Sequence, residues 1–100
     1  MNKNYYVYII TNKLRTVFYI GVTNNLERRL LEHESEIIPG FSQKYKLKHF
    51  VYFEEYSEVD DALRREKQLK NWHRDWKLNL IRRMNPKLKD LKLGAETSSA

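Results

Sequence analysis

The stretch from Tyr19 to His33 most constrains the fold of this chain, because it must change from strand to helix within a few residues. It begins with β-favouring residues and reaches Gly21, where we expect a turn. Asn24 can then accept a hydrogen bond from the amides of the first helical turn, and Glu27, three residues later, can reach back to it. An apolar stripe at helical spacing follows, formed by Leu26, Leu30 and Leu31.

The remaining segments alternate between strand and helix patterns, so the expected fold class is α/β (α+β). Residues 5–11 are rich in aromatic and β-branched residues and are apolar on both faces, which is typical of an interior strand. A polar turn at 12–16 leads to strand character at 17–21, and these two strands are expected to form an antiparallel hairpin. The other predicted elements are a helix at 24–36, a loop at 37–46 with Pro39 and Gly40, a strand at 47–55, a helix capped by Ser57 with Asp60 three residues later, a helix at 75–84 and a short packed segment with Leu88, Leu91 and Leu93.

The composition narrows the class of protein. One hundred residues suggest a single domain, expected at 1–93 and followed by a disordered tail at 94–100. The chain has no cysteine, which excludes a disulfide framework and a thiolate metal site. It shows no signal-peptide pattern and no apolar run near the ~20 residues of a membrane span. These features predict a cytoplasmic protein with no membrane partner.

The net charge of +6 is unevenly distributed along the chain. Residues 1–53 carry eight Lys or Arg against four acids, whereas residues 54–63 carry five acids and no base. Residues 64–83 carry eight bases against two acids. This basic block is a candidate footprint for a polyanion such as DNA, although a solvated helix face explains the same pattern equally well.

Glu66 is the most informative anomaly in the sequence. It lies on the line that connects the apolar positions of its helix, where a carboxylate is costly unless it is paired or bound to a cation. Two interpretations stay open: Glu66 bends to the helix edge and pairs with Arg29 or Lys70, or it projects into a cleft as a cation ligand. The apolar positions on that line are Val59, Ala62, Leu63, Leu69, Trp72 and Trp76.

Arg29 and His33 are four residues apart and therefore neighbours on one helix face. Together with Tyr19 at the end of the preceding strand, they would meet near one point, an arrangement that a phosphodiester site can use. Arg29 is also explained by an ion pair with Glu32 or Glu36 on its own helix, which is worth only ~0.3–0.5 kcal/mol.

Three other aromatic residues have two interpretations each. Trp72 and Trp76 recur at helical spacing, so we expect core packing rather than base stacking. Tyr45 lies in the basic segment 44–48, where contact with DNA and packing within the loop are both open.

Five elements in order resemble the GIY-YIG nuclease superfamily. Tyr6-Val7-Tyr8 is followed, eleven residues after Tyr8, by Tyr19-Ile20-Gly21, which is similar to the paired motif that names the family. Arg29, His33 and Glu66 follow in the family's order. The likeness covers residues 5–86 and is strongest to a small single-domain branch that shares the run at 62–72, here Ala-Leu-Arg-Arg-Glu-Lys-Gln-Leu-Lys-Asn-Trp.

The resemblance implies a small three-stranded antiparallel sheet flanked by helices, and a metal-dependent DNA endonuclease that uses one Mg²⁺ or Mn²⁺. By this likeness Glu66 is the metal ligand, and Tyr8 takes the proton from the attacking water. Tyr19 lines the scissile phosphate, Arg29 contacts it, and His33 is hydrogen-bonded near the nucleophile. A structure-selective role in DNA repair or recombination is expected, with a homodimer or a partner protein supplying specificity. The alternative is a non-catalytic nucleic-acid-binding module that retains the nuclease fold.

The residue types suit this chemistry. A planar guanidinium grips phosphoryl oxygens, and a lone carboxylate matches Mg²⁺, which keeps several of its waters. A free tyrosine has a pKa near 10, so Tyr8 would need its phenolate favoured by the cation or by Arg29. The chain departs from the family pattern at Tyr6, where the motif has glycine, and at Val22, where some repair relatives have lysine. Asn85 is a weak match to a late asparagine of several relatives.

Overall fold

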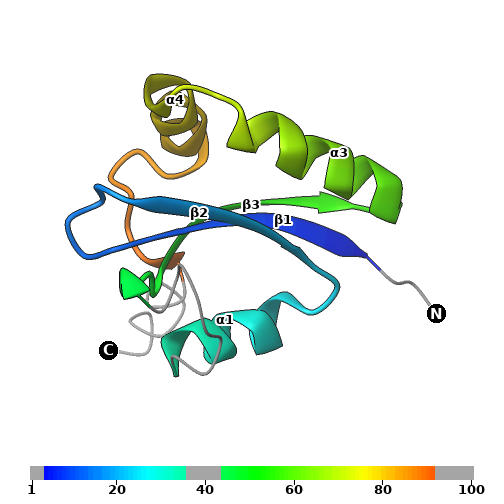
Figure 1. The fold of residues 1–100 in the computed structure, drawn as a ribbon, viewed down its shortest axis with the longest axis horizontal. Coiled ribbons are helices and arrows are strands. Elements are labelled where there is room, and N and C mark those ends of the chain that lie inside the picture. Colours follow the sequence, from blue (N-terminus) through cyan, green and yellow to red (C-terminus); the bar gives the residue numbers. More distant parts are fainter. Residues whose placement is uncertain (1–3, 36–43, 92–100) are drawn as a thin grey trace.

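The computed structural model describes residues 4–35 and 44–91, which form a three-layer arrangement around one sheet (Figure 1). Helix α1 covers one face of the sheet, and α3 and α4 cover the other. None of the helices in these two ranges has the length and apolar character needed to cross a bilayer. In chain order the elements are β1 (Tyr5–Thr11), β2 (Phe18–Thr23), α1 (Leu26–Glu34), β3 (His49–Tyr56), α3 (Val59–Lys70) and α4 (Arg74–Met84).

The sheet has three antiparallel strands, as the resemblance implied, and the structure gives their order as β2-β1-β3. The limits of β1 are those predicted, and its central position confirms the expectation of an interior strand. Val7 and Ile9 face the core beneath α3 and α4, whereas Tyr8 and Ile10 face the core beneath α1. The chain therefore has a small core on each side of one sheet, and β1 belongs to both.

The predicted helix starts were wrong by one or two residues. Strand β2 continues beyond Gly21 to Thr23, so Gly21 lies inside a strand rather than at a turn. The Thr23 hydroxyl accepts from the backbone amide of Asn25 at 3.1 Å, and Asn25, not Asn24, caps α1 by accepting from the amide of Arg28 at 3.0 Å. Because β2 is longer than predicted, the helix cap lies one residue later in the chain, and Glu27 takes no part in the cap.

The start of α3 differs in the same way. Strand β3 continues to Tyr56, so only Ser57 and Glu58 remain before the helix. Glu58 occupies the capping position in an extended conformation, without a side-chain capping bond. Ser57 therefore does not cap this helix as predicted.

Three of the six apolar residues on the predicted line through α3 are solvent-exposed, namely Val59, Leu63 and Trp76. Among its members only Ala62 and Leu69 are buried, and Trp72 packs against the core beneath α3 and α4. Trp76 is 55% exposed, so the expectation of core packing for it was wrong. The physical reason is that α3 ends at Lys70 and α4 begins at Arg74, so the helical period does not continue from one to the other.

The segment after α4 is held by Asn85. Its side-chain amide donates to the carbonyls of Val51 at 3.1 Å and Lys89 at 2.7 Å, and its oxygen accepts from the Lys89 amide. Leu88 is buried in the core beneath α3 and α4, and Leu91 packs against the core beneath α1. Asn85 thus has a structural role here. The predictions for residues 36–43, for Leu93 and for the tail lie outside the described residues.

The position of the α1 cap gives a test of the fold. Asn25→Ala is expected to lower the free energy of unfolding by about 1 kcal/mol, because the Arg28 amide loses its acceptor. Asn24→Ala, the change predicted from sequence to matter, is expected to have almost no effect because Asn24 is exposed and makes no capping bond to Arg28. Urea unfolding of both variants measures the difference, and a larger loss for Asn24→Ala would contradict the observed cap.

Candidate functional site

The side chain of Tyr8 crosses the backbone of Gly21. The two residues are opposite each other in the β1–β2 ladder. A Cβ built on Gly21 would lie 2.5 Å from the Tyr8 hydroxyl oxygen and 2.6 Å from its Cζ, so any other residue at this position would displace the Tyr8 ring. Glycine at this position therefore lets the Tyr8 ring lie across β2, the outer strand of the pair, and brings its hydroxyl toward that edge of the sheet.

The Tyr8 hydroxyl ends in a cluster of three rings. It is hydrogen-bonded to Nε2 of His33 at 2.9 Å, and both side chains are almost completely buried. The ring centroids of Tyr8 and Tyr19 are each 5.7 Å from that of His33, and 6.4 Å from each other. The sheet supplies the two phenols and α1 supplies the imidazole, so three of the predicted site residues are brought together.

The surroundings of Tyr8 keep its phenol protonated. Burial raises the pKa of Tyr8 well above its usual value, and the nearby Tyr19 and the carboxylates of Glu66 and Glu32 raise it further. The Arg29 guanidinium acts in the opposite direction. These influences show that Arg29 and Glu66 both lie close enough to act electrostatically on the Tyr8 phenol.

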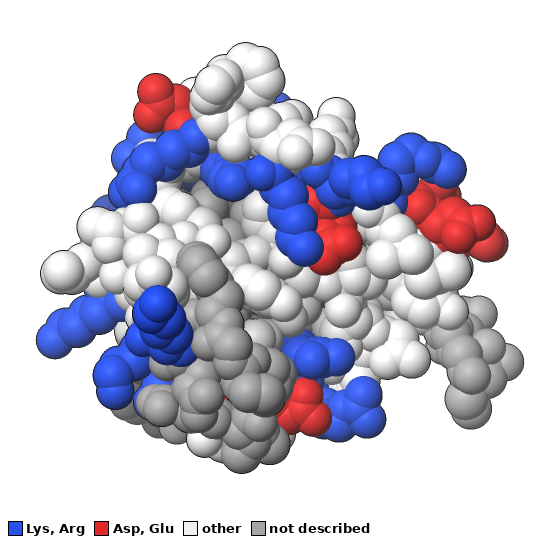
Figure 2. Space-filling model, in the orientation of Figure 1, with Lys and Arg blue, Asp and Glu red and all other residues white. Residues whose placement is uncertain are grey.

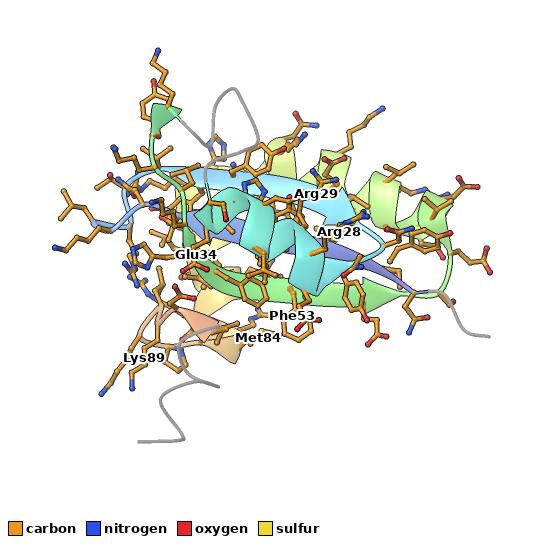
Figure 3. The ribbon with its side chains drawn as sticks, turned by 90° about the horizontal axis from the view of Figure 1, so that it is seen from below. Arg28, Arg29, Glu34, Phe53, Met84 and Lys89 are labelled. Atoms are coloured by element: carbon orange, nitrogen blue, oxygen red, sulfur yellow. The ribbon has the colours of Figure 1, made fainter. Side chains whose placement is uncertain are left out.

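Arg29 offers an N–H group to this site. Its Nε is buried, and it has no hydrogen-bond partner in the part of the chain that the structure describes. A carboxylate oxygen of Glu32 is 3.8 Å from this Nε, which makes an ion pair too long for a hydrogen bond. Figure 3 views the molecule from the α1 side and shows Arg29 on the β2 side of α1, opposite Phe53. A buried guanidinium donor without an acceptor is suited to an incoming anion.

Glu66 approaches from α3, on the opposite face of the sheet from α1. Its side chain is 21% exposed, and Lys70, one turn later, forms an ion pair with it at 3.0 Å. The pairing with Lys70 that the sequence left open is therefore present. Glu66 is also partly exposed to solvent, so its carboxylate is open to a cation.

A partly buried ionic network fixes α3, and with it the direction of Glu66. Glu54 on β3 accepts hydrogen bonds from Arg65 at 2.9 and 3.0 Å and from the hydroxyls of Tyr52 and Tyr56. Burial raises the pKa of Glu54, but these hydrogen bonds and the Arg65 charge outweigh it, so the pKa is lowered overall. Because Arg65 directly precedes Glu66, the network sets the rotation of α3 on the sheet. Sequence reasoning missed this network; its only signal was the acidic end of β3 followed by the Arg64-Arg65 pair in the second turn of α3.

The comparisons with known proteins agree with this geometry. The family model of the GIY-YIG catalytic domain matches residues 4–79. The chain belongs to the GIY-YIG family. It is 32% identical over 77 residues to a UPF0213 protein of Staphylococcus haemolyticus, which covers 77% of this chain and 93% of that protein. It is 37% identical over 87 residues to a UPF0213 protein of Syntrophus aciditrophicus, with 86% and 97% covered.

A solved structure has a similar fold. The solution NMR structure of the UPF0213 protein BH0048 from Bacillus halodurans superimposes with a TM-score of 0.51 at 27% identity, covering 78% of this chain and 82% of that one. Membership of the small single-domain GIY-YIG family indicates a nuclease domain and confirms the resemblance seen in the sequence. The GIY-YIG glycine of the second motif is the one that Tyr8 crosses.

The contact between Tyr8 and Gly21 leads to a second prediction. Gly21→Ala is expected to cost about 1–3 kcal/mol of stability, because the added methyl displaces the Tyr8 ring. In a Tyr8→Leu background, which lacks the outer ring atoms, the same change is expected to cost less than ~0.5 kcal/mol. Urea unfolding of the four chains measures the coupling. Equal costs in the two backgrounds would show that Tyr8 is not what the glycine accommodates.

Proposed function

We propose that this chain is a metal-dependent DNA endonuclease that hydrolyses phosphodiester bonds. The observation that carries the proposal is the Tyr8 phenol, which is held by His33 and lies within electrostatic reach of Arg29 and Glu66. A proton acceptor, an anion-binding guanidinium and a carboxylate around one point are what phosphodiester hydrolysis requires.

Arg29 would bind the scissile phosphate. Hydrolysis increases the negative charge on the phosphoryl oxygens, and a guanidinium that stays charged and planar stabilises that charge. Its buried Nε supplies a donor without an acceptor among the described residues. Tyr19, at the wall of the ring cluster, would line the same phosphate.

Tyr8 and His33 would move the proton together. The raised pKa of Tyr8 argues against a free phenolate as the base. With Nε2 of His33 unprotonated, the Tyr8 hydroxyl donates to it across 2.9 Å. As the phenol passes its proton to Nε2, its oxygen takes a proton from the attacking water, so the charge ends on the imidazole. Histidine is the side chain best suited to accept a proton near neutral pH.

The side chains around the site indicate which metal ion they could hold. Within residues 4–35 and 44–91 no group of three metal-ligating His, Asp or Glu side chains converges. A single accessible carboxylate fits Mg²⁺ or Mn²⁺, which complete their coordination with water and phosphate oxygens. Glu66 would hold the cation, and the ion pair between Lys70 and the Glu66 carboxylate would break when the cation binds. When bound, the cation would supply charge stabilisation at the phosphate and the leaving oxygen.

The surface charge supports DNA as the substrate. Figure 2 shows Lys and Arg side chains along the α3–α4 layer and further basic side chains around α1, with largely uncharged surface between them. Basic side chains on both sides of the sheet would attract a polyanion to the sheet edge between them. We further propose that the chain acts as a single domain that recognises branched or otherwise distorted DNA, as in repair or recombination, alone or with a partner.

The cleavage assay is the first test of the nuclease. Branched, nicked and single-stranded DNA are incubated with Mg²⁺ or Mn²⁺, and Glu66→Gln is expected to reduce cleavage by at least about 100-fold. Tyr8→Phe and His33→Ala are expected to reduce it by about 10²- to 10⁴-fold, because they break one proton path. Asp60→Asn removes the same charge from an exposed position of the same helix and serves as the control. Salt-sensitive binding without cleavage of any substrate would instead identify a non-catalytic binding module.

The ion pair between Glu66 and Lys70 gives a test of the metal site that needs no activity. Lys70→Met is expected to tighten Mn²⁺ binding by up to about fivefold, because the carboxylate no longer has to exchange a partner. Lys67→Met makes the same charge change on another face of the helix and is expected to leave the affinity unchanged. Electron paramagnetic resonance of free Mn²⁺ measures the binding. The metal assignment fails if Glu66→Gln binds Mn²⁺ as well as the unchanged chain does.

A further inference from the structure

A second feature of the surface lies on α4, apart from the candidate active site. It is an open hollow of about 210 Å³ lined by Trp72, Trp76, Asn79, Leu80 and Arg83. Helix α4 lies on the opposite face of the sheet from α1, so this hollow is separate from the Tyr8–His33 cluster. The proposed cleavage reaction makes no use of it.

The two indoles in the hollow have different surroundings. Trp72 is partly buried, and the Arg65 guanidinium lies over its ring at 5.1 Å from the centroid. Trp76 is 55% exposed and meets Trp72 and His73 edge to face, with interplanar angles of 87° and 88°. Neither of these ring contacts is a parallel stack. An exposed indole in a concave surface is therefore open to a planar ligand.

The polar side chains of the hollow define which planar ligand fits. Asn79 and Arg83 follow Trp76 by three and seven residues, so they share its face of α4. Asn79 offers both a donor and an acceptor, and Arg83 offers a cation two turns from the indole. The helix carries four Lys or Arg against one acid, Asp75. This combination fits a nucleobase on Trp76 and a phosphate on Arg83 better than an uncharged apolar ligand.

We propose that this hollow binds an unpaired nucleotide of a DNA strand, with its base stacked on Trp76 and its phosphate on Arg83. The bases of a duplex already stack on each other, so only an unpaired base can present its face to the indole. The hollow would hold a single-stranded region next to the scissile duplex, which gives the proposed nuclease a means of recognising distorted DNA. The inference takes DNA as the ligand from the proposed function but does not require cleavage.

Intrinsic fluorescence gives a local readout, because the two tryptophans of the chain both line the hollow. The full chain is titrated with a single-stranded oligo(dT) and with a blunt duplex of the same length, in EDTA so that no metal-dependent cleavage occurs. We expect saturable quenching by oligo(dT) and little by the duplex. Trp76→Ala is expected to weaken oligo(dT) binding, measured by anisotropy of a labelled strand, by roughly five- to a hundredfold.

Two arginines make a matched control for the position of the phosphate. Arg83→Ala is expected to weaken oligo(dT) binding and reduce the quenching, whereas Arg82→Ala removes the same charge from the neighbouring face of α4 and should do neither. Equal effects of the two variants, or equal quenching by the duplex, would overturn the proposal. A fluorescence change that depends on protein concentration without DNA would make the hollow a contact between copies of the chain and would also overturn it. Quenching without cleavage in Mg²⁺ would support the hollow while rejecting the nuclease, and cleavage without quenching would do the reverse.

Discussion

The structure depends on the crossing of one tyrosine ring over one glycine. Tyr8 belongs to the central strand, and its hydroxyl approaches the edge of the sheet because Gly21 has no Cβ in its path. The hydrogen bond to His33 then joins the sheet to α1 within a buried environment. A slip of one residue in the β1–β2 ladder would turn Tyr8 to the other face of the sheet. The register of this hairpin therefore decides both the packing of α1 and the existence of the site.

The site takes its groups from both layers around the sheet. His33 and Arg29 come from α1, whereas Glu66 comes from α3 on the opposite face. An edge is the place where groups from two faces of a sheet can meet, because the strands themselves separate them elsewhere. The Glu54–Arg65 network fixes α3 on β3, and Glu66, the next residue, is partly exposed and paired with Lys70. Structural and proposed functional charges are thus adjacent in the sequence but lie on different sides of α3.

The break between α3 and α4 explains why the hollow on α4 was not predicted from the sequence. In the sequence, Trp72 and Trp76 follow each other at helical spacing, and a continuous helix would bury both. The break between Lys70 and Arg74 places Trp76 on a new helix axis, where it is exposed beside Arg83. A single exposed aromatic residue is ordinary, so it is the concave surface that Trp76 shares with Asn79 and Arg83 that points to a ligand.

The sequence by itself determined the elements and the family. The aromatic and β-branched run of β1 needs no tertiary information to be recognised as an interior strand, and the spacing of Tyr8, Tyr19, Arg29, His33 and Glu66 identifies the GIY-YIG pattern. The sequence placed the caps of α1 and α3 one residue too early, because the preceding strands are longer than predicted. Strand length depends on pairing with β1 and not on the propensity of the residues alone. Only the tertiary structure decided that Gly21 accommodates Tyr8, that Lys70 is the ion-pair partner of Glu66 and that Trp76 faces solvent. The first and the third depend on how separate segments of the chain pack together and on where one helix ends, which no residue pattern records. The Glu66–Lys70 pair lies within α3, and the sequence had already offered it beside Arg29.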